Sequence, residues 1–148
     1  MRAPVALCEV EGEALRRALT VAFGDETLAS RSTAAAFAQA RRRWRTVASL
    51  PDPMVWIDVT AVRHARRRLA RLERRSSAGR PRDDPLAALS PMARVAIVLH
   101  ACRARSVDDV AEALATSPPV VETLLRDAYR TLGVVDAVIE EDAAPYAG

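Results

Sequence analysis

The sequence predicts an all-α protein of two small helical domains joined by a flexible linker. Apolar residues recur at the spacing of one helix face in several stretches, and proline, glycine or a serine at a cap position bounds these stretches. Residues 76–85 are polar, contain glycine and proline, and lack apolar periodicity, as linkers do. Half of the 148 residues are apolar, which is enough to bury a core.

The first part of the chain, residues 1–75, predicts a three-helix domain. Residues 13–23 have the apolar spacing of a short helix, which Gly24 ends and Gly12 separates from the residues before it. Residues 27–47 continue as an alanine-rich helix that closes in a run of arginines. We therefore expect two helices before the proline-containing segment that follows.

The third helix of this domain is predicted over residues 53–75. Pro51 and Pro53 precede it and break the earlier helix, because proline disfavours helix in the residue before it. One side of the predicted helix is apolar and carries Val55, Val59, Val62, Ala65, Leu69 and Leu72. The opposite side is basic and carries Arg63, Arg67, Arg68, Arg71, Arg74 and Arg75, whereas Arg66 lies near the apolar side.

This basic side indicates binding to nucleic acid. Guanidinium groups can pair with phosphates through two hydrogen bonds, or read guanine in the major groove. An ordinary solvated helix face is the alternative, but such faces usually alternate acids with arginines, and Glu73 is the only acid between Asp58 and Asp83. Residues 41–82 hold 13 arginines and 3 acids, whereas residues 83–148 hold 5 arginines and 11 acids, so the positive charge is local.

The segment 86–133 predicts a second helical domain of the helix-turn-helix type. A serine stands at the expected N-cap of three helices, at Ser90, Ser106 and Ser117. Pro91 and Pro118 occupy first helical positions, and Gly133 ends the last helix. The last two helices are separated only by the turn at 115–117, an arrangement in which the second helix enters the major groove. The tail, 134–148, is assigned no function.

No pattern in the sequence points to an enzyme, a metal or a cofactor. His64 and His100 lack partners at ligand spacing, and no phosphate loop or nucleophile with a base is present. Cys102 is expected to pack in an apolar helix, and the two tryptophans are expected in the core rather than stacked on bases. Two cysteines, no secretory signal and no apolar run of about 20 residues favour a cytoplasmic protein without a membrane segment.

Taken together, these residues resemble a bacterial extracytoplasmic-function sigma factor, with its second conserved domain within 1–75 and its fourth at 86–133. In the first half the comparable residues are Phe23-Gly24-Asp25, Leu28-Ala29, Ala36-Phe37, Trp44, Leu50-Pro51-Asp52-Pro53 and Trp56. In the second half they are Leu86, Leu89-Ser90-Pro91, Arg94, Leu99 and the run from Ser106 to Leu114. The match in the second half is the more specific.

The resemblance implies a dissociable subunit of RNA polymerase core that recognises promoter DNA and helps to open it. The loop before the arginine-rich helix would capture an unstacked base of the −10 element through Ala48, Ser49, Leu50 and Asp52. Duplex and phosphate contacts there would come from Arg63, Arg67, Arg68 and Arg71. The −35 element would be read by Thr123, Arg126 and Arg130, and the polymerase core would contact Arg31, Ala34 and Phe37.

Two segments depart from the family pattern. Residues 30–36 carry Arg31 in place of the usual acids and glutamine that dock on the polymerase core, so we expect an altered core contact. The last helix carries Glu122 and Leu124 where basic residues are typical, and an acid near phosphates costs affinity. Two alternatives therefore remain open: a sigma-like regulator that binds a protein such as an anti-sigma factor without initiating transcription, and a stand-alone helix-turn-helix regulator.

Overall fold

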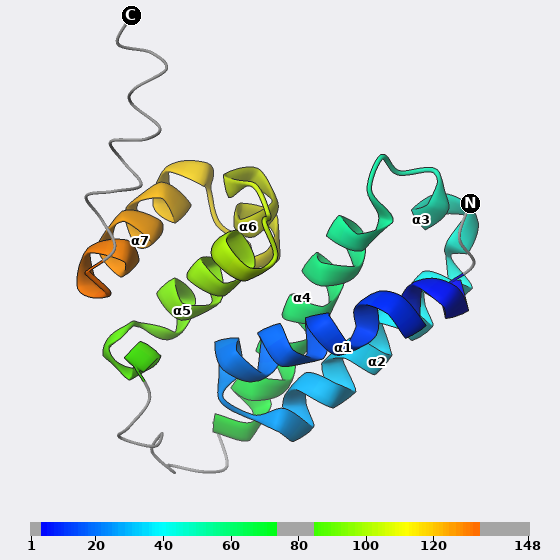
Figure 1. Cartoon of the computed structure of the whole chain (residues 1–148), viewed down its shortest axis with the longest axis horizontal. Helices are drawn as coiled ribbons and strands as arrows, with labels where there is room; N and C mark the ends of the chain where they lie inside the picture. The colour runs from blue at the N-terminus through cyan, green and yellow to red at the C-terminus, as the bar shows by residue number, and fades with distance from the viewer. Residues whose placement is uncertain (1–3, 74–84, 134–148) are drawn as a thin grey trace, which may run out of the picture.

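The computed structural model describes residues 4–73 and 85–133, and every regular element within these ranges is helical (Figure 1). The N-terminal group consists of α1 (Pro4–Phe23), α2 (Glu26–Arg42), α3 (Trp44–Ala48) and α4 (Pro53–Glu73). The C-terminal group consists of η1 (Pro85–Ala88), α5 (Pro91–Ile97), η2 (Val98–Cys102), α6 (Val107–Ala113) and α7 (Pro118–Thr131). The all-helical prediction is confirmed for these residues, whereas the predicted tail and all of the predicted linker except Pro85 lie outside them.

The first helix is longer than its sequence predicted, because α1 runs through Gly12 without a break. A Cβ atom at Gly12 would lie 3.5 Å from Cys8 Sγ of the same helix and 3.8 Å from Phe37 Cε2 of α2, which are ordinary packing distances. Glycine lowers helix stability by only about 0.5–1 kcal/mol relative to alanine, which tertiary packing along a helix can outweigh. The expected interruption at this glycine was therefore wrong.

The second helix is shorter than predicted, because the chain leaves α2 at Arg43 and restarts as α3. Arg43 has φ −114° and ψ 27°, outside the helical range, and separates the two helices. The start of α2 is capped by Asp25, whose carboxylate accepts a hydrogen bond of 3.0 Å from the Leu28 amide. Trp44 is half-buried against the core, in agreement with the packing role predicted for it.

The arginine-rich helix α4 is buried on two sides, because it packs against α2 and also against α6. Val59, Val62 and Ala65 are buried as predicted, and the core takes further α4 side chains that the single apolar stripe did not include: Met54, Ile57, Asp58 and Ala61. Leu72 is 42% exposed, contrary to its place in the stripe. It belongs to the final turn of α4, where no described element covers it.

Capping residues define the C-terminal helices. Ser90 accepts a hydrogen bond from the Ala93 amide, and Ser106 forms a reciprocal capping box with Asp109. Ser117 occupies the N-cap position of α7 but makes no side-chain cap bond, contrary to the prediction. The two residues that follow it are prolines and have no N–H, and the Val120 N–H is donated to the backbone oxygen of Ser117.

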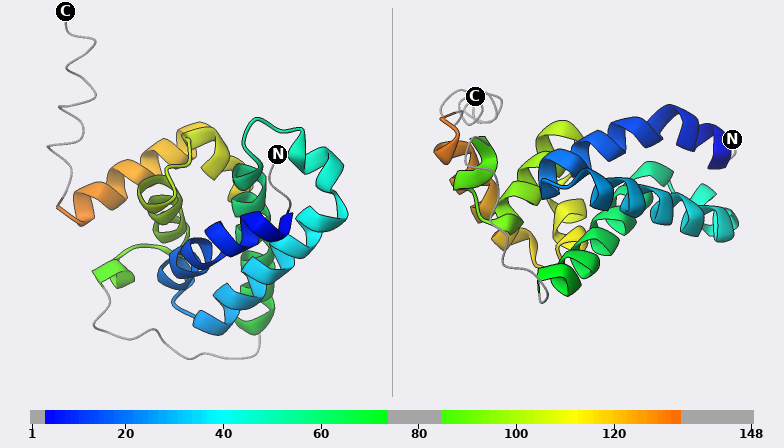
Figure 2. Two further views of the ribbon diagram at one scale, coloured as in Figure 1. Left: turned by 45° about the vertical axis from the view of Figure 1, so that its right-hand side comes forward. Right: turned by 90° about the horizontal axis from the view of Figure 1, so that it is seen from below.

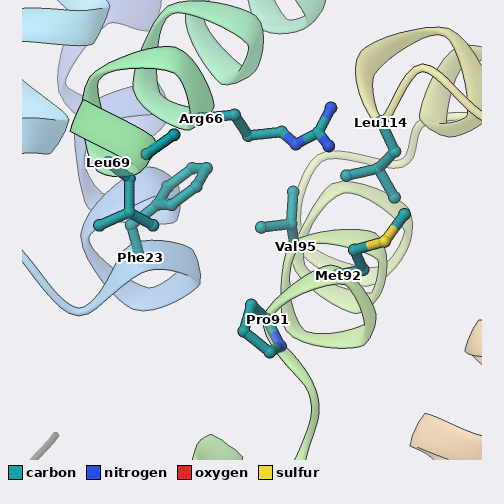
Figure 3. A pocket seen from close by; sticks show the side chains of 8 residues that line it. Phe23, Arg66, Leu69, Pro91, Met92, Val95 and Leu114 are labelled. Atoms are coloured by element: carbon teal, nitrogen blue, oxygen red, sulfur yellow. The ribbon is translucent and has the colours of Figure 1, made fainter. Parts of the chain in front are cut away.

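The two groups of helices pack directly against each other (Figure 2), with α4 against α6 and α1 against α5. Arg94 is 2% exposed and its Nε donates to the backbone oxygen of Val21 at 2.8 Å. A cavity of about 180 Å³ remains between the groups, lined by Phe23, Arg66, Leu69, Ala70, Pro91, Met92, Val95 and Leu114 (Figure 3). The helices of both groups thus share one extended core.

Candidate nucleic-acid interface

The basic side of α4 faces solvent over much of its length. Arg63, Arg67 and Arg71 are exposed, and Arg66 and Arg68 are half-buried. Among the described residues, no carboxylate forms an ion pair with any of these five arginines. Arg67 Nε donates to the backbone oxygen of Arg63 at 3.3 Å, which leaves the terminal nitrogens of Arg67 available to an outside acceptor. Arg74 and Arg75, from the same predicted face, lie outside the described residues.

His64 lies within this basic helix and responds to its charge. Its Nδ1 is 3.1 Å from the hydroxyl of Ser32, a buried residue of α2. Burial lowers the pKa of His64 below its ordinary value of 6.5, and the charges of Arg68, Arg67 and Arg71 lower it further. The imidazole is therefore neutral at pH 7 and adds no charge to this face of α4.

A short turn joins α6 to α7, and α7 has an exposed polar side. The turn is closed by a hydrogen bond of 2.9 Å from the Thr116 amide to the backbone oxygen of Ala111. The packed side of α7 consists of Val121, Leu125 and Ala128. The predicted reading residues Thr123, Arg126 and Arg130 are all exposed. Exposed acids, Glu122 and Asp127, lie among them, so this surface carries mixed charge.

The loop predicted to capture a base borders a cavity of about 380 Å³. Leu50 and Asp52 line it together with half-buried Trp56 of α4, whereas Ser49 lies outside the lining and donates to the backbone oxygen of Thr46 at 2.6 Å. The opposite wall is acidic and comes from the C-terminal group, through Asp109 and Glu112. This cavity can therefore receive an apolar or ring-shaped group that donates hydrogen bonds, but its acids disfavour phosphate.

Asp52 is held by two partners at the edge of this cavity. One carboxylate oxygen accepts from the Met54 amide at 3.0 Å, which caps the start of α4, and the other accepts from Arg105 Nη1 at 3.4 Å.

The predicted polymerase-core contact on α2 is only partly exposed. Arg31 and Ala34 are exposed, whereas Phe37 is only 6% exposed and packs in the core. Phe37 thus offers little surface to a partner.

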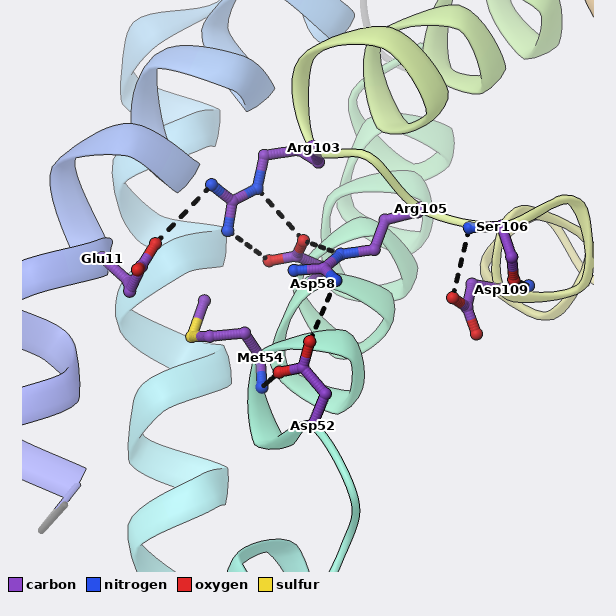
Figure 4. Close-up of polar contacts among 8 residues, drawn as sticks. All are labelled: Glu11, Asp52, Met54, Asp58, Arg103, Arg105, Ser106 and Asp109. Carbon is purple, nitrogen blue, oxygen red and sulfur yellow. Dashed lines mark hydrogen bonds and ion pairs between the residues drawn. The ribbon is translucent and has the colours of Figure 1, made fainter. Parts of the chain in front are cut away.

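No sequence pattern singled out Asp58, which binds the two helix groups together (Figure 4). Its side chain is fully buried, and both carboxylate oxygens accept from Arg103, each at 3.1 Å. Arg105 Nε donates to one of these oxygens at 2.7 Å, and Arg103 also lies 3.9 Å from Glu11. The only sequence signal was an acid within an apolar stretch of α4, and its partners lie 45 and 47 residues later.

The contact with Asp58 also shifts the pKa of Arg105. Burial by itself would lower the pKa of Arg105, but the hydrogen bond and charge of Asp58 outweigh it and raise the pKa above its usual value. Arg103 binds the same carboxylate through two hydrogen bonds, so two guanidinium groups surround Asp58. These arginines are committed to structure and are not available to a ligand.

The isolated histidine and cysteine residues have ordinary environments. His100 Nδ1 lies 2.7 Å from the Tyr129 hydroxyl, a contact that joins η2 to α7. Cys102 is exposed, contrary to its expected packing role; it is the last residue of the π turn η2, directly before the chain leaves the helix at Arg103. No group of three possible ligands among the described residues could hold a metal ion. None of the described helices is long and apolar enough to cross a membrane.

Comparisons with known proteins add no assignment: no family model, no curated protein and no solved structure matches this chain.

Proposed function

We propose that this protein is a sigma-like DNA-binding factor that works with RNA polymerase core at promoters. One observation carries the proposal: a helix with three exposed, unpaired arginines, Arg63, Arg67 and Arg71, lies in the same molecule as a helix-turn-helix that exposes the polar side of its second helix. Helix-turn-helix proteins read base edges with that second helix. The arginine helix supplies the electrostatic term that dominates affinity for nucleic acid.

The division of work follows from the charges of the two surfaces. On α4, arginines without acidic neighbours suit phosphates, which set the position of the protein on DNA but carry no sequence information. On α7, Arg126 and Arg130 can pair with guanine, while Thr123 adds a hydroxyl for either base edge. Glu122 can accept from the amino group of cytosine. We therefore expect α4 to provide most of the affinity and α7 most of the specificity.

Strand capture would use the cavity beside the loop before α4. Trp56 and Leu50 offer apolar surface for the face of a base, and the carboxylates at the cavity edge can accept hydrogen bonds from exocyclic amino groups. The acids of α6 would repel the backbone phosphates of the same strand.

A second candidate is a sigma-like regulator that acts by binding a protein. The favouring observation is the exposed surface of α2 and α3, which carries basic residues and no described acid beyond the first turn of α2: Arg31, Arg41, Arg42 and Arg45. Such a surface suits an acidic protein partner, such as an anti-sigma factor, better than it suits the polymerase contact that the family resemblance implies.

The deciding experiment is co-elution of the purified protein with bacterial RNA polymerase core on a sizing column at moderate salt. A stable complex supports the initiation factor, and transcription from a promoter library then tests the function. A folded protein that binds DNA without core would indicate a stand-alone regulator. Binding to neither core nor DNA would overturn the proposal in favour of the protein-binding regulator.

A variant of α2 sharpens this test. Arg31→Glu combined with Ala34→Gln restores an acid and an amide at two exposed positions of the segment 30–36. If the lost acids weaken the core contact, this variant should bind core more tightly than the parent protein. Arg42→Glu changes the same charge near the end of α2 and is the matched control. Equal binding by both variants would exclude the segment as the reason for weak binding.

A further inference from the structure

A second groove crosses the junction between the two helix groups, beside the turn that joins α6 to α7. It has a volume of about 490 Å³ and is lined by Arg63, Arg66, Arg67 and Ala70 of α4 and by Ala115 from the turn between α6 and α7. The α4 residues alone would form only a convex helix surface. The turn of the C-terminal group supplies the opposite wall, so the groove exists only while the two groups are in contact.

The charged side chains that line this groove are all positive. Three arginines line it and no carboxylate does. Arg66 Nη1 lies 3.4 Å from the backbone oxygen of Ala113, at the C-terminal end of α6, where the helix dipole favours a cation. This weak contact holds Arg66 between the groups and leaves its other nitrogens free to bind a ligand.

The opposite wall is a fixed piece of backbone with a small side chain. Ala115 has φ 53°, in the left-handed region, and its amide donates to the backbone oxygen of Glu112 at 3.2 Å. The next amide, of Thr116, bonds back to Ala111. A turn held in this way, with an exposed methyl group, lets a ligand approach closely without a side chain to displace.

The position of that wall relative to α4 is set by the buried Asp58 network. Arg103 and Arg105 lie just before α6 in the sequence and are bonded to Asp58 of α4. The capping box at Ser106 then fixes the start of α6 directly after Arg105. The groove is therefore built in advance rather than assembled by a ligand, which reduces the ordering cost of binding.

We propose that this groove holds a phosphate of duplex DNA, so that the arginine helix and the helix-turn-helix grip one backbone together. The inference rests on the proposed DNA-binding function and adds to it a composite site that includes Arg66 and the turn at Ala115. Arg63 and Arg67 are one helix turn apart, about 6 Å along the axis, and both face the groove. Guanidinium groups arranged in this way match the successive charges of a nucleic-acid backbone.

The test varies the charge of the wall that α4 does not supply. Ala115→Glu places a carboxylate in the groove and should weaken binding to a random-sequence duplex roughly five- to ten-fold at 0.1 M salt, the loss of about one phosphate contact. Ala115→Arg should strengthen binding, which a folding defect cannot imitate. Ala104 is the matched control, because it is also exposed and also has φ 53° but does not line the groove. Ala104→Glu should leave DNA affinity within about two-fold of the parent.

The outcomes separate this inference from the function on which it rests. If Arg63, Arg67 and Arg71 are needed for DNA binding but the two glutamate variants behave alike, the composite groove is wrong and the DNA-binding function stands. If the parent protein does not bind DNA, both are wrong. Inorganic pyrophosphate is the remaining probe: if its binding is lost in Ala115→Glu while DNA affinity is unchanged, the groove takes a free polyphosphate and the DNA assignment is overturned.

Discussion

The arginines of α4 and those that precede α6 have the same chemistry and opposite environments. Arg63, Arg67 and Arg71 are exposed and meet no described acid, whereas Arg103 and Arg105 are turned inward onto the fully buried Asp58. The first set adds positive charge that only an outside anion can balance. The second set balances a buried charge and joins two groups of helices. A high arginine content therefore indicates nucleic-acid binding only for arginines that do not pair with an acid of the protein itself.

The largest expected effect comes from removing the acid of the buried set. Asp58→Ala leaves Arg103 and Arg105 at a buried site without their carboxylate, so we expect the free energy of unfolding to fall by about 3–5 kcal/mol. Urea denaturation followed by circular dichroism measures it. Asp108→Ala, at an exposed position of α6, is the control and should cost less than about 1 kcal/mol. A similar loss in both variants would mean that the buried network around Asp58 contributes no more to the free energy of unfolding than an exposed acid does.

The second prediction applies one substitution to both sets of arginines. Replacing Arg63, Arg67 and Arg71 together by alanine should leave the free energy of unfolding unchanged or raise it, because the repulsion among these like charges is removed. The same variant should lower the salt dependence of DNA binding by roughly three units, one for each lost phosphate contact. Arg103→Ala should do the reverse, with reduced stability and an unchanged salt slope.

A matched control keeps net charge out of this comparison. Arg41, Arg42 and Arg45 are also exposed, and replacing them with alanine removes the same three charges from α2 and α3. The salt slope of that variant should remain close to that of the parent protein. If it falls as far as in the α4 variant, DNA responds to total charge alone and the α4 surface is not the interface.

A smaller effect is expected from the N-cap of α6, the helix that begins directly after Arg105 and Ser106. Ser106→Ala removes the capping box of α6 and should cost about 1 kcal/mol in unfolding free energy. Ser117→Ala should cost much less, because the Ser117 side chain makes no cap bond at the start of α7. Thermal denaturation of the two variants gives the comparison. Equal losses would show that the two serines stabilise their helices by another means.

The smallest effect is a change in the titration of His64, followed by NMR. The pKa of His64 is lowered by burial and by nearby arginines, so the unfolded chain takes up a proton at a higher pH than the folded chain does. Stability should therefore decrease as the pH falls through 6.5, and level off below the folded-state pKa. Replacing Arg63, Arg67 and Arg71 should raise this pKa, as should bound DNA. The pKa should not move in the α2 and α3 variant.

Local features of the fold were predictable because they depend on neighbours in sequence. The start of α4 at Pro53, the cap at Ser90 and the capping position of Ser106 follow from the conformational limits of proline and from serine side chains that accept backbone N–H groups. The predictions failed where packing overrode a local preference. Gly12 lies inside α1 because tertiary packing along that helix outweighs the low helix propensity of one glycine. At Ser117 the reason is local, because Pro119 has no N–H and the Val120 N–H bonds the Ser117 backbone oxygen instead of its side chain.

The candidate site divides in the same way. The basic face of α4 was predictable from helical periodicity alone, and so was the exposed polar side of α7. The burial of Phe37 and of Asp58 could not be predicted in this way, because each depends on a helix far away in the sequence. The acidic wall of the cavity near Leu50 was also unpredictable, because its residues come from α6, which is distant in the sequence.

By itself, the sequence determined the helical class, most helix boundaries and the face on which α4 carries its arginines. These properties arise from interactions between residues a few positions apart, which caps and periodicity record directly. Only the tertiary structure decided that Arg103 and Arg105 pair with Asp58, and that Ala115 closes a groove over Arg63, Arg66 and Arg67. Those contacts join residues about 45 or more positions apart, and no local pattern specifies which distant side chains share a buried space.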